Sequence, residues 1–252
     1  MEAYGRFADV YDTFMDNVPY EEWCDYICGI LSENGIRDGL VLDLACGTGA
    51  MTRLLKGRGY DMIGVDVSGD MLQAARRYED ADILYLQQDM RAFELYGTVR
   101  AVVCLCDSLN YILEEDELEH VFSLVNNYLD PQGIFIFDMN TVYKYREVLG
   151  EAVICDNRED ACFTWENWFD EESCINEYAL NFFVKTEGDL YERFEEVHYQ
   201  RAYEIRAVER LIRSAGLKLL AVYGEGGRKK PEPDCERVYF VAQEQGKSVV
   251  LH

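Results

Sequence analysis

The sequence predicts an α/β fold in which a mostly parallel sheet is covered by helices. Short apolar runs of strand length alternate with amphipathic segments along most of the chain, which is the pattern of β–α–β units. The run 101–106 is apolar throughout, as a strand buried on both faces must be. A chain of 252 residues can form one large domain with an insertion, or one domain with a small satellite.

Each expected element follows from its local pattern. Residues 1–34 carry apolar side chains at helical spacing, and 115–129 has an apolar stripe. Residues 130–133 (DPQG) are expected to form a turn. The expected helices are 1–34, 49–57, 68–78, 115–129 and 203–215. The expected strands are 39–44, 61–66, 83–86, 101–106, 134–138, 217–223 and 237–242.

The composition changes between 152 and 199, where the residues are aromatic, acidic and β-prone. Turn-forming sequences at 170–173 and 187–189 divide this segment, so it is predicted to be an antiparallel meander. The α/β pattern resumes afterwards, which makes the meander an insertion. Its aromatic side chains either cover a substrate pocket or form a dimer face, because Trp, Tyr and Phe are enriched at interfaces.

The charge is strongly acidic, with 48 Asp and Glu against 24 Lys and Arg and a net charge of −24. Such a surface repels phosphate backbones and anionic lipid. Nucleic acid and membrane partners are therefore not expected. The longest apolar stretches are strand-sized and fall short of the ~18 residues of a membrane span.

The first residues and the cysteines indicate a cytoplasmic protein. The start of the chain lacks the basic and apolar regions of a secretion signal. The nine cysteines are odd in number, and several lie inside strand-like or helix-like runs, so reduced thiols are expected. Cys24 and Cys28 are one helical turn apart, but no second pair with zinc spacing accompanies them. No metal site is predicted.

A glycine-containing turn at 43–49 (DLACGTG) joins the first expected strand to a helix. Glycines there let the backbone bend sharply and let a ligand approach closely. Thr52 stands where a dinucleotide fingerprint has its third glycine. Asp43 would oppose a pyrophosphate but suits a ligand with a cationic amino group. Both features favour S-adenosylmethionine over NAD.

Acidic residues also follow the next two expected strands. Asp66 ends the second strand, where an acid can accept hydrogen bonds from both ribose hydroxyls; a helix-capping acid is the alternative. Asp89 and Met90 follow the third, where they can contact an adenine amino group and ring, although a turn Asp is also common. The three acids fall at the carboxyl ends of consecutive strands, where open α/β sheets bind ligands.

These motifs resemble the class I S-adenosylmethionine-dependent methyltransferases. The run 43–49 matches the glycine-rich motif of that superfamily closely. Other segments look like a bacterial small-molecule branch that is similar to glycine and sugar-amine N-methyltransferases. The further segments that carry the likeness are 4–12 (YGRFADVYD), 20–23 (YEEW), 64–68 (GVDVS), 88–90 (QDM), 106–111 (CDSLNY) and 137–141 (FDMNT).

The resemblance covers nearly the whole chain and implies a Rossmann-like, seven-stranded sheet with helices on both faces. One strand, 237–242, would be antiparallel. The chain would divide into an N-terminal helical lid (1–34), a cofactor-binding domain (35–150 and 201–245) and an inserted β-rich cap over the substrate (151–200). The glycine motif is specific for the superfamily, and nothing in the sequence is specific for a substrate.

The resemblance also implies how S-adenosylmethionine binds before S-adenosylhomocysteine is released. Asp66 would hold the ribose, and Asp89 and Met90 the adenine. Tyr11 and Trp23 are the expected contacts from the lid, because an aromatic face suits a sulfonium; plain core packing is the alternative for Trp23. The remaining expected cofactor contacts are Asp43, Ala45, Cys46, Gly47, Gly49, Val67, Met71, Cys106 and Asp107.

Methyl transfer depends more on orientation of the reactants and exclusion of water than on a strong base, because the cofactor carries the reactive group. Asp107 and Tyr111 are the expected catalytic residues, with Asn110 and Asn140 as further candidates. They would orient an amino or hydroxyl group, or Asp107 would accept a proton; ordinary loop and cap roles are the alternative. His198 is the one histidine suited to base work, although a structural role is commoner in a meander.

Two other functions stay open at this point. An NAD-dependent oxidoreductase would have its third glycine at position 52 and no use for Asp43. A non-catalytic protein that binds S-adenosylmethionine would keep the glycine motif and Asp66 but lack a substrate cavity. Nucleic-acid amino-methyltransferases typically carry a proline-rich motif after the fourth strand, whereas 106–109 (CDSL) has no proline. The expected partner is a small-molecule substrate, and a homodimer is possible.

Overall fold

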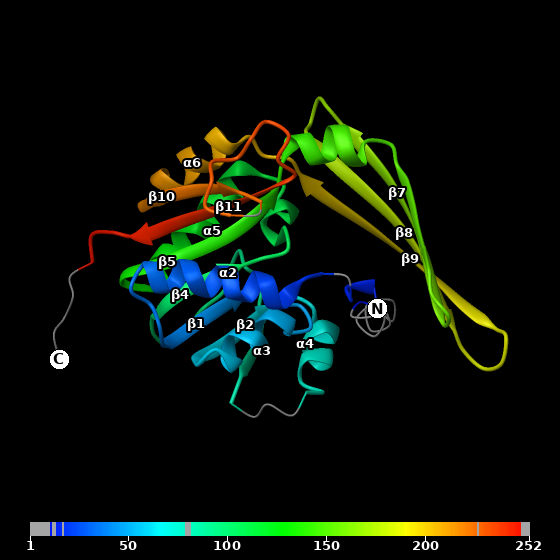
Figure 1. Cartoon of the computed structure of the whole chain (residues 1–252), viewed down its shortest axis with the longest axis horizontal. Helices are drawn as coiled ribbons and strands as arrows, with labels where there is room; N and C mark the ends of the chain where they lie inside the picture. The colour runs from blue at the N-terminus through cyan, green and yellow to red at the C-terminus, as the bar shows by residue number, and fades with distance from the viewer. Residues whose placement is uncertain (1–10, 12–13, 17, 79–81, 226, 248–252) are drawn as a thin grey trace.

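The computed structural model describes residues 11, 14–16, 18–78, 82–225 and 227–247. They form a seven-stranded sheet A and a four-stranded sheet B that projects from one side of the molecule (Figure 1). The strands of sheet A are β1 (Gly39–Leu44), β2 (Tyr60–Asp66), β3 (Leu84–Gln87), β4 (Val99–Cys104), β5 (Leu129–Asn140), β10 (Leu217–Gly224) and β11 (Arg237–Glu244). The helices are α2 (Tyr20–Glu33), α3 (Ala50–Gly57), α4 (Gly69–Ala75), α5 (Glu115–Tyr128) and α6 (Ile205–Ser214), with a 3-10 helix η1 (Ser108–Tyr111) and a π-helix η2 (Lys144–Leu149).

Sheet A has the strand order β10-β11-β5-β4-β1-β2-β3. Its central pairings are parallel, and β11 is antiparallel to both of its neighbours. The prediction of a seven-stranded, mostly parallel sheet with one antiparallel strand is confirmed. Parallel strands end at the same edge of a sheet, so the residues that follow β1, β2, β3 and β4 come together there.

Helices cover both faces of sheet A, as predicted. Helices α5 and α6 pack on one face, where Val102 and Phe135 are fully buried. Helices α2, α3 and α4 pack on the other, where Val103 and Ile136 are buried. Successive residues of β4 therefore enter opposite cores, which explains why this strand is apolar throughout. No helix in the described ranges is long and apolar enough to cross a bilayer.

The expected turn at 130–133 is wrong. Strand β5 already begins at Leu129, which pairs with Val99 before the register shifts and Ala101 pairs with Ile134. Gln132 takes a φ of 64° inside this irregularity. The Asp, Pro and Gly residues thus bend the chain without ending its pairing, because a bulge accommodates left-handed backbone within a strand.

Two expected boundaries also differ. In the part of the segment 1–34 that the structure describes, Tyr11 and Phe14 are helical, but a turn at Met15 and Asp16 and then Pro19 separate them from α2. The remaining residues of this segment, 1–10, 12–13 and 17, lie outside the described ranges. The fourth strand ends at Cys104 rather than at 106, because Cys106 and Asp107 have positive φ angles of 60° and 51°.

The chain leaves sheet A after β5, forms sheet B, and returns to the first part of the fold at α6. The sheet B strands β6 (Val153–Asn157), β7 (Ala161–Asp170), β8 (Ile175–Lys185) and β9 (Tyr191–Arg201) pair antiparallel in sequence order, so the predicted meander is confirmed. The junction with sheet A has its own small core around Tyr145 and Tyr178. The Asn110 side chain ties this junction, because it donates to the carbonyls of Asn140 (3.3 Å) and Arg201 (2.8 Å).

Candidate active site

The loop after β1 is folded around three residues in the left-handed region. Ala45, Gly47 and Gly49 have φ angles of 64°, 55° and 74°. A Cβ at Gly49 would collide with the Tyr85 hydroxyl, whereas one at Gly47 would meet no atom within 4 Å. Gly49 is therefore required by close packing behind the loop. Gly47 instead borders open space, as a residue in contact with a ligand must.

Asp66 links the ends of β1 and β2. Its Oδ2 accepts a hydrogen bond from the Gly47 amide (2.8 Å), and its Oδ1 accepts one from the Ser68 amide (2.9 Å). Each oxygen has a second lone pair for a further donor. Burial raises the pKa of Asp66 above its usual value, and the amide hydrogen bonds oppose that effect.

Asp43 lies beneath the same loop and is almost completely buried. Its Oδ2 accepts a hydrogen bond of 2.5 Å from the Thr52 hydroxyl. Position 52, which a dinucleotide fingerprint gives to glycine, thus holds a side chain that binds the carboxyl. Burial raises the pKa of Asp43 to about 7; the Thr52 hydrogen bond lowers it, and the nearby Asp66 raises it further.

This raised pKa predicts a pH dependence of stability. In the unfolded chain the carboxyl titrates near pH ~3.9, so between that value and about pH 7 the folded protein binds more protons than the unfolded chain. Its contribution to stability is present below that window and falls by up to ~1.4 kcal/mol per pH unit as the pH rises through it. We expect Asp43→Asn to flatten this decline, measured as the free energy of unfolding in urea at pH 5 and pH 7.

Asp38 provides the control for that measurement, because its side chain is 77% exposed and pairs with Arg100 at the surface. Asp38→Asn should leave the pH dependence of the wild type unchanged. An equal slope in the wild type and in Asp43→Asn would show that Asp43 is ionised in the folded protein across this pH range.

Asp89 follows β3 and pairs with Arg91 at 2.6 Å. The Arg91 hydrogen bond holds the pKa of Asp89 below its usual value, so this carboxylate is ionised at neutral pH. The pairing with Arg91 was not predicted from the sequence. It uses part of the hydrogen-bonding capacity of Asp89 that was expected to serve adenine. Asp89 and Met90 nevertheless border the cavity described below.

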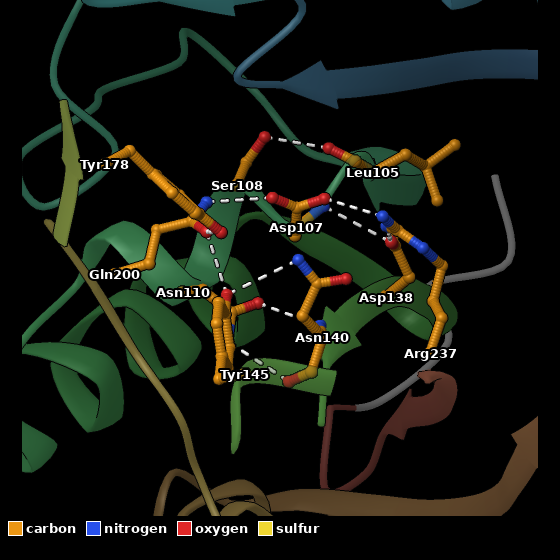
Figure 2. A network of polar contacts seen from close by, with 10 residues as sticks. All are labelled: Leu105, Asp107, Ser108, Asn110, Asp138, Asn140, Tyr145, Tyr178, Gln200 and Arg237. Carbon is orange, nitrogen blue, oxygen red and sulfur yellow. Dashed lines mark hydrogen bonds and ion pairs between the residues drawn. The ribbon is translucent and has the colours of Figure 1, made fainter. Parts of the chain in front are cut away.

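A polar network surrounds Asp107 where β4 ends (Figure 2). Its Oδ1 accepts from Arg237 (2.7 Å) and its Oδ2 from the Gln200 amide (2.8 Å). Gln200 Oε1 in turn accepts from the hydroxyls of Tyr145 (2.8 Å) and Tyr178 (2.5 Å). This chain of contacts connects the end of β4 to the inner face of sheet B, so the two sheets share one polar centre.

Arg237 is the cation of this network and is only 8% exposed. It pairs with Asp107 and, more closely, with Asp138 at the end of β5. Burial lowers the pKa of Arg237, but Asp107 above all raises it by more, so the guanidinium stays charged. Arg237 also lies 5.4 Å from the centre of the Trp23 ring, which places a cation against this aromatic side chain.

A single cavity of about 1010 Å³ joins these features. Of the residues predicted to bind cofactor or to catalyse, all except Gly49 and Asn110 line it, including Tyr11, Trp23 and Tyr111. The cavity continues to sheet B, where Trp165 and His198 line it. Arg237 and Gln200 were not predicted from the sequence, although Arg237 begins an antiparallel strand and so had to lie where its parallel neighbours end.

Comparisons with known proteins agree with this geometry. Residues 41–133 match the methyltransferase domain model. YqeM of Bacillus subtilis (strain 168), a protein named as a methyltransferase, is 36% identical over 98% of this chain and 99% of its own length. The chain belongs to the S-adenosylmethionine-dependent methyltransferases. A crystal structure of such an enzyme from Clostridium acetobutylicum ATCC 824 is 32% identical, covers 96% of this chain and 99% of its own, and superposes with a TM-score of 0.86.

Other relatives of this methyltransferase carry more specific names. The dTDP-3-amino-3,4,6-trideoxy-alpha-D-glucopyranose N,N-dimethyltransferase of Streptomyces venezuelae is 27% identical over 87% of this chain and 92% of its own length. The crystal structure of DesVI from Streptomyces venezuelae is 26% identical, covers 94% and 98% of the two chains, and has a TM-score of 0.79. The family excludes the alternative of an NAD-dependent oxidoreductase.

The residues around the loop fit the cofactor of this family. Open space borders Gly47, and Asp43 and Asp66 line the same cavity. Acidic groups suit a ligand with a sulfonium and an amino group, and Asp66 retains acceptor capacity for hydroxyl donors. When bound, S-adenosylmethionine supplies an activated methyl group.

Proposed function

We propose that this methyltransferase transfers a methyl group to the amino group of a small molecule held between the end of β4 and sheet B. The observation that carries the proposal is the continuous cavity from the Gly47 loop to the aromatic wall of sheet B. A cofactor at the loop and an acceptor at the wall would meet near Asp107. Relatives named as amino-sugar and glycine N-methyltransferases support an amine as the acceptor.

We assign the cofactor contacts on the same basis. Asp66 holds the ribose hydroxyls, and Asp89 with Met90 contacts the adenine. Tyr11 and Trp23 close the cavity from the N-terminal side. All five residues line the cavity. The remaining proposed contacts are Asp43, Ala45, Cys46, Gly47, Val67, Met71, Cys106 and Asp107, with Gly49 shaping the loop from behind.

Asp107 and Tyr111 take orienting roles in this proposal. Both Asp107 oxygens accept hydrogen bonds from cavity residues, one of them from a guanidinium. Such a carboxylate is a firm anchor for an amine N–H. Tyr111 lies four residues further, at the end of η1, and lines the same cavity.

Calorimetric titration tests the cofactor, and product release tests the reaction. We expect micromolar binding of S-adenosylmethionine and S-adenosylhomocysteine and no binding of NAD. Glycine and dTDP-3-amino-3,6-dideoxyglucose are the two amine probes, and we expect one of them to increase the release of S-adenosylhomocysteine. Binding without release from either amine would contradict the proposed acceptor class; release with hydroxyl compounds alone would assign an O-methyltransferase.

The cellular location, the domain division and the oligomeric state are part of this proposal. All nine cysteines are unpaired, which supports the proposed cytoplasmic location. The division into a lid (1–34), a cofactor domain (35–150 and 201–245) and a cap (151–200) stays a prediction, as does a homodimer.

A further inference from the structure

A histidine and a glutamate project from β9 on the cavity side of sheet B. Residues alternate between the two faces of a strand, so Glu196 and His198 share a face with Gln200, which reaches Asp107. His198 Nε2 lies 2.9 Å from Glu196 Oε2. The side chains of His198 and Glu196 are 15% and 5% exposed. His198 lines the cavity, and Glu196 is buried behind it.

Groups from neighbouring elements fix the position of the imidazole. Tyr178 of β8 is its cross-strand partner, and the Tyr111 ring meets it edge-on with centroids 5.8 Å apart. The titratable groups that face His198 in the described ranges are Glu196 on its own strand, Tyr178 on β8 and Tyr111 on η1. Asp107, Asp156 and Lys144 line the same cavity. Glu196 is thus the carboxylate in direct contact with the ring.

Burial of Glu196 defines the orientation of the histidine. A buried carboxylate is costly unless a donor or a cation compensates it, and in the part of the chain that the structure describes the Glu196 Oε1 has no hydrogen-bond partner. The Oε2 contact therefore calls for a proton on His198 Nε2. In the neutral ring that tautomer places the basic lone pair on Nδ1. A carboxylate behind a histidine also stabilises the imidazolium that forms when Nδ1 takes up a proton.

His198 lies next to the region of the cavity where the acceptor is proposed to bind. Gln200 touches Asp107 beside the cofactor loop, and His198 lies two residues along β9, a distance of about 7 Å between Cα atoms. An acceptor bound between Asp107 and the wall of sheet B would therefore lie within reach of the imidazole. His120, in contrast, is exposed on α5 and does not line the cavity.

We propose that His198 is the general base that deprotonates the acceptor amine, and that Glu196 positions it. This inference rests on the proposed function. The bound ammonium gives one proton to His198 Nδ1 and regains its nitrogen lone pair. That lone pair forms the new bond to the methyl carbon, while the carbon–sulfur bond breaks and its electrons go to sulfur. The products are S-adenosylhomocysteine and a methylated ammonium, and the imidazolium then releases its proton to water.

Nitrogen NMR of the histidine rings in the full chain, with S-adenosylhomocysteine added, tests the orientation without turnover. His198→Gln identifies the signal, and His120→Gln serves as the matched control. We expect the Nε2–H tautomer for His198 in the wild type and a change of its ring signals in Glu196→Gln. An Nδ1–H tautomer, or signals that Glu196→Gln leaves unaltered, would overturn the proposal.

The pH profile of kcat/KM, measured with the two amines above, tests the chemistry. General bases typically contribute ~10²–10⁴-fold, so we expect His198→Gln to lose at least ~100-fold at pH 7. The loss should shrink as the pH approaches the pKa of the free amine, because the acceptor then arrives deprotonated. Glu196→Gln should lower kcat, and His120→Gln should match the wild type.

The two proposals fail in different ways. If the wild type forms no product with either amine, the proposed function is wrong. If the wild type is active and His198→Gln keeps its kcat, or loses activity equally at every pH, His198 has a structural role and the inference is wrong. Unaltered calorimetric binding of S-adenosylhomocysteine in His198→Gln shows that the variant is folded.

Discussion

Replacing Asp66 with alanine is expected to weaken S-adenosylmethionine binding by about 5- to 150-fold, or about 1–3 kcal/mol. The carboxylate holds the Gly47 amide and the Ser68 amide, one on each oxygen. It would also receive the ribose hydroxyls of the cofactor. The variant therefore loses hydrogen bonds to the ligand and loosens the loop that borders it. Calorimetric titration with S-adenosylmethionine measures the change.

Asp61 is the matched control for this variant, since it lies on the same strand with a side chain 74% exposed. Asp61→Ala should bind the cofactor as the wild type does. Asp66→Ala should still fold, because no partner cation loses its counter-charge; circular dichroism verifies this. A folded Asp66→Ala protein with wild-type affinity would remove Asp66 from the ribose site.

Replacing Arg237 with methionine should destabilise the fold by about 3–5 kcal/mol, the usual cost of removing one partner of a buried ion pair. Asp138 is 1% exposed, and its Oδ1 has no hydrogen-bond partner among the described residues. Its Oδ2 depends on Arg237 and on the Asp107 amide (3.2 Å). Without the guanidinium, the carboxylate of Asp138 stays buried and uncompensated.

Urea unfolding measures this loss, and two variants establish its cause. Adding Asp138→Asn to Arg237→Met should recover part of the lost free energy, because the remaining group is then neutral. Arg58 pairs with Asp25 and Glu21 at the surface, so Arg58→Met should cost less than about 1 kcal/mol. If Arg237→Met proves no more destabilising than Arg58→Met, Asp138 is protonated in the folded protein.

The residues proposed to bind the cofactor could be placed together from the sequence because their positions depend on local signals. The glycine motif and Asp66 each follow a strand, and parallel strands bring such residues together without further information. The other half depends on tertiary structure. Gln200 contacts Asp107 only because of the path that the insertion takes. Arg237 matters because it pairs with two acidic residues from distant segments of the chain. No spacing in the sequence connects these residues.

The errors in the sequence prediction arise where tertiary contacts decide the local structure. Residues 130–133 have turn-forming composition, yet Leu129 before them and Ile134 after them both pair with β4, which keeps the segment in the sheet. The π-helix at Lys144–Leu149 was not predicted, although the two residues that it buries, Tyr145 and Leu149, have helical spacing. Both pack at the junction with sheet B, which the sequence does not locate.

Sheet B enters and leaves the fold at neighbouring points, since the Asn110 side chain contacts both Asn140 and Arg201. A segment whose two ends meet can be exchanged without rerouting the chain on either side. Sheet B, the proposed wall of the acceptor site, is thus a replaceable segment, whereas the loop at Gly47 belongs to the core of the fold. Descendants of this fold can acquire new acceptors by remodelling one contiguous stretch while inheriting the methyl-donor site intact.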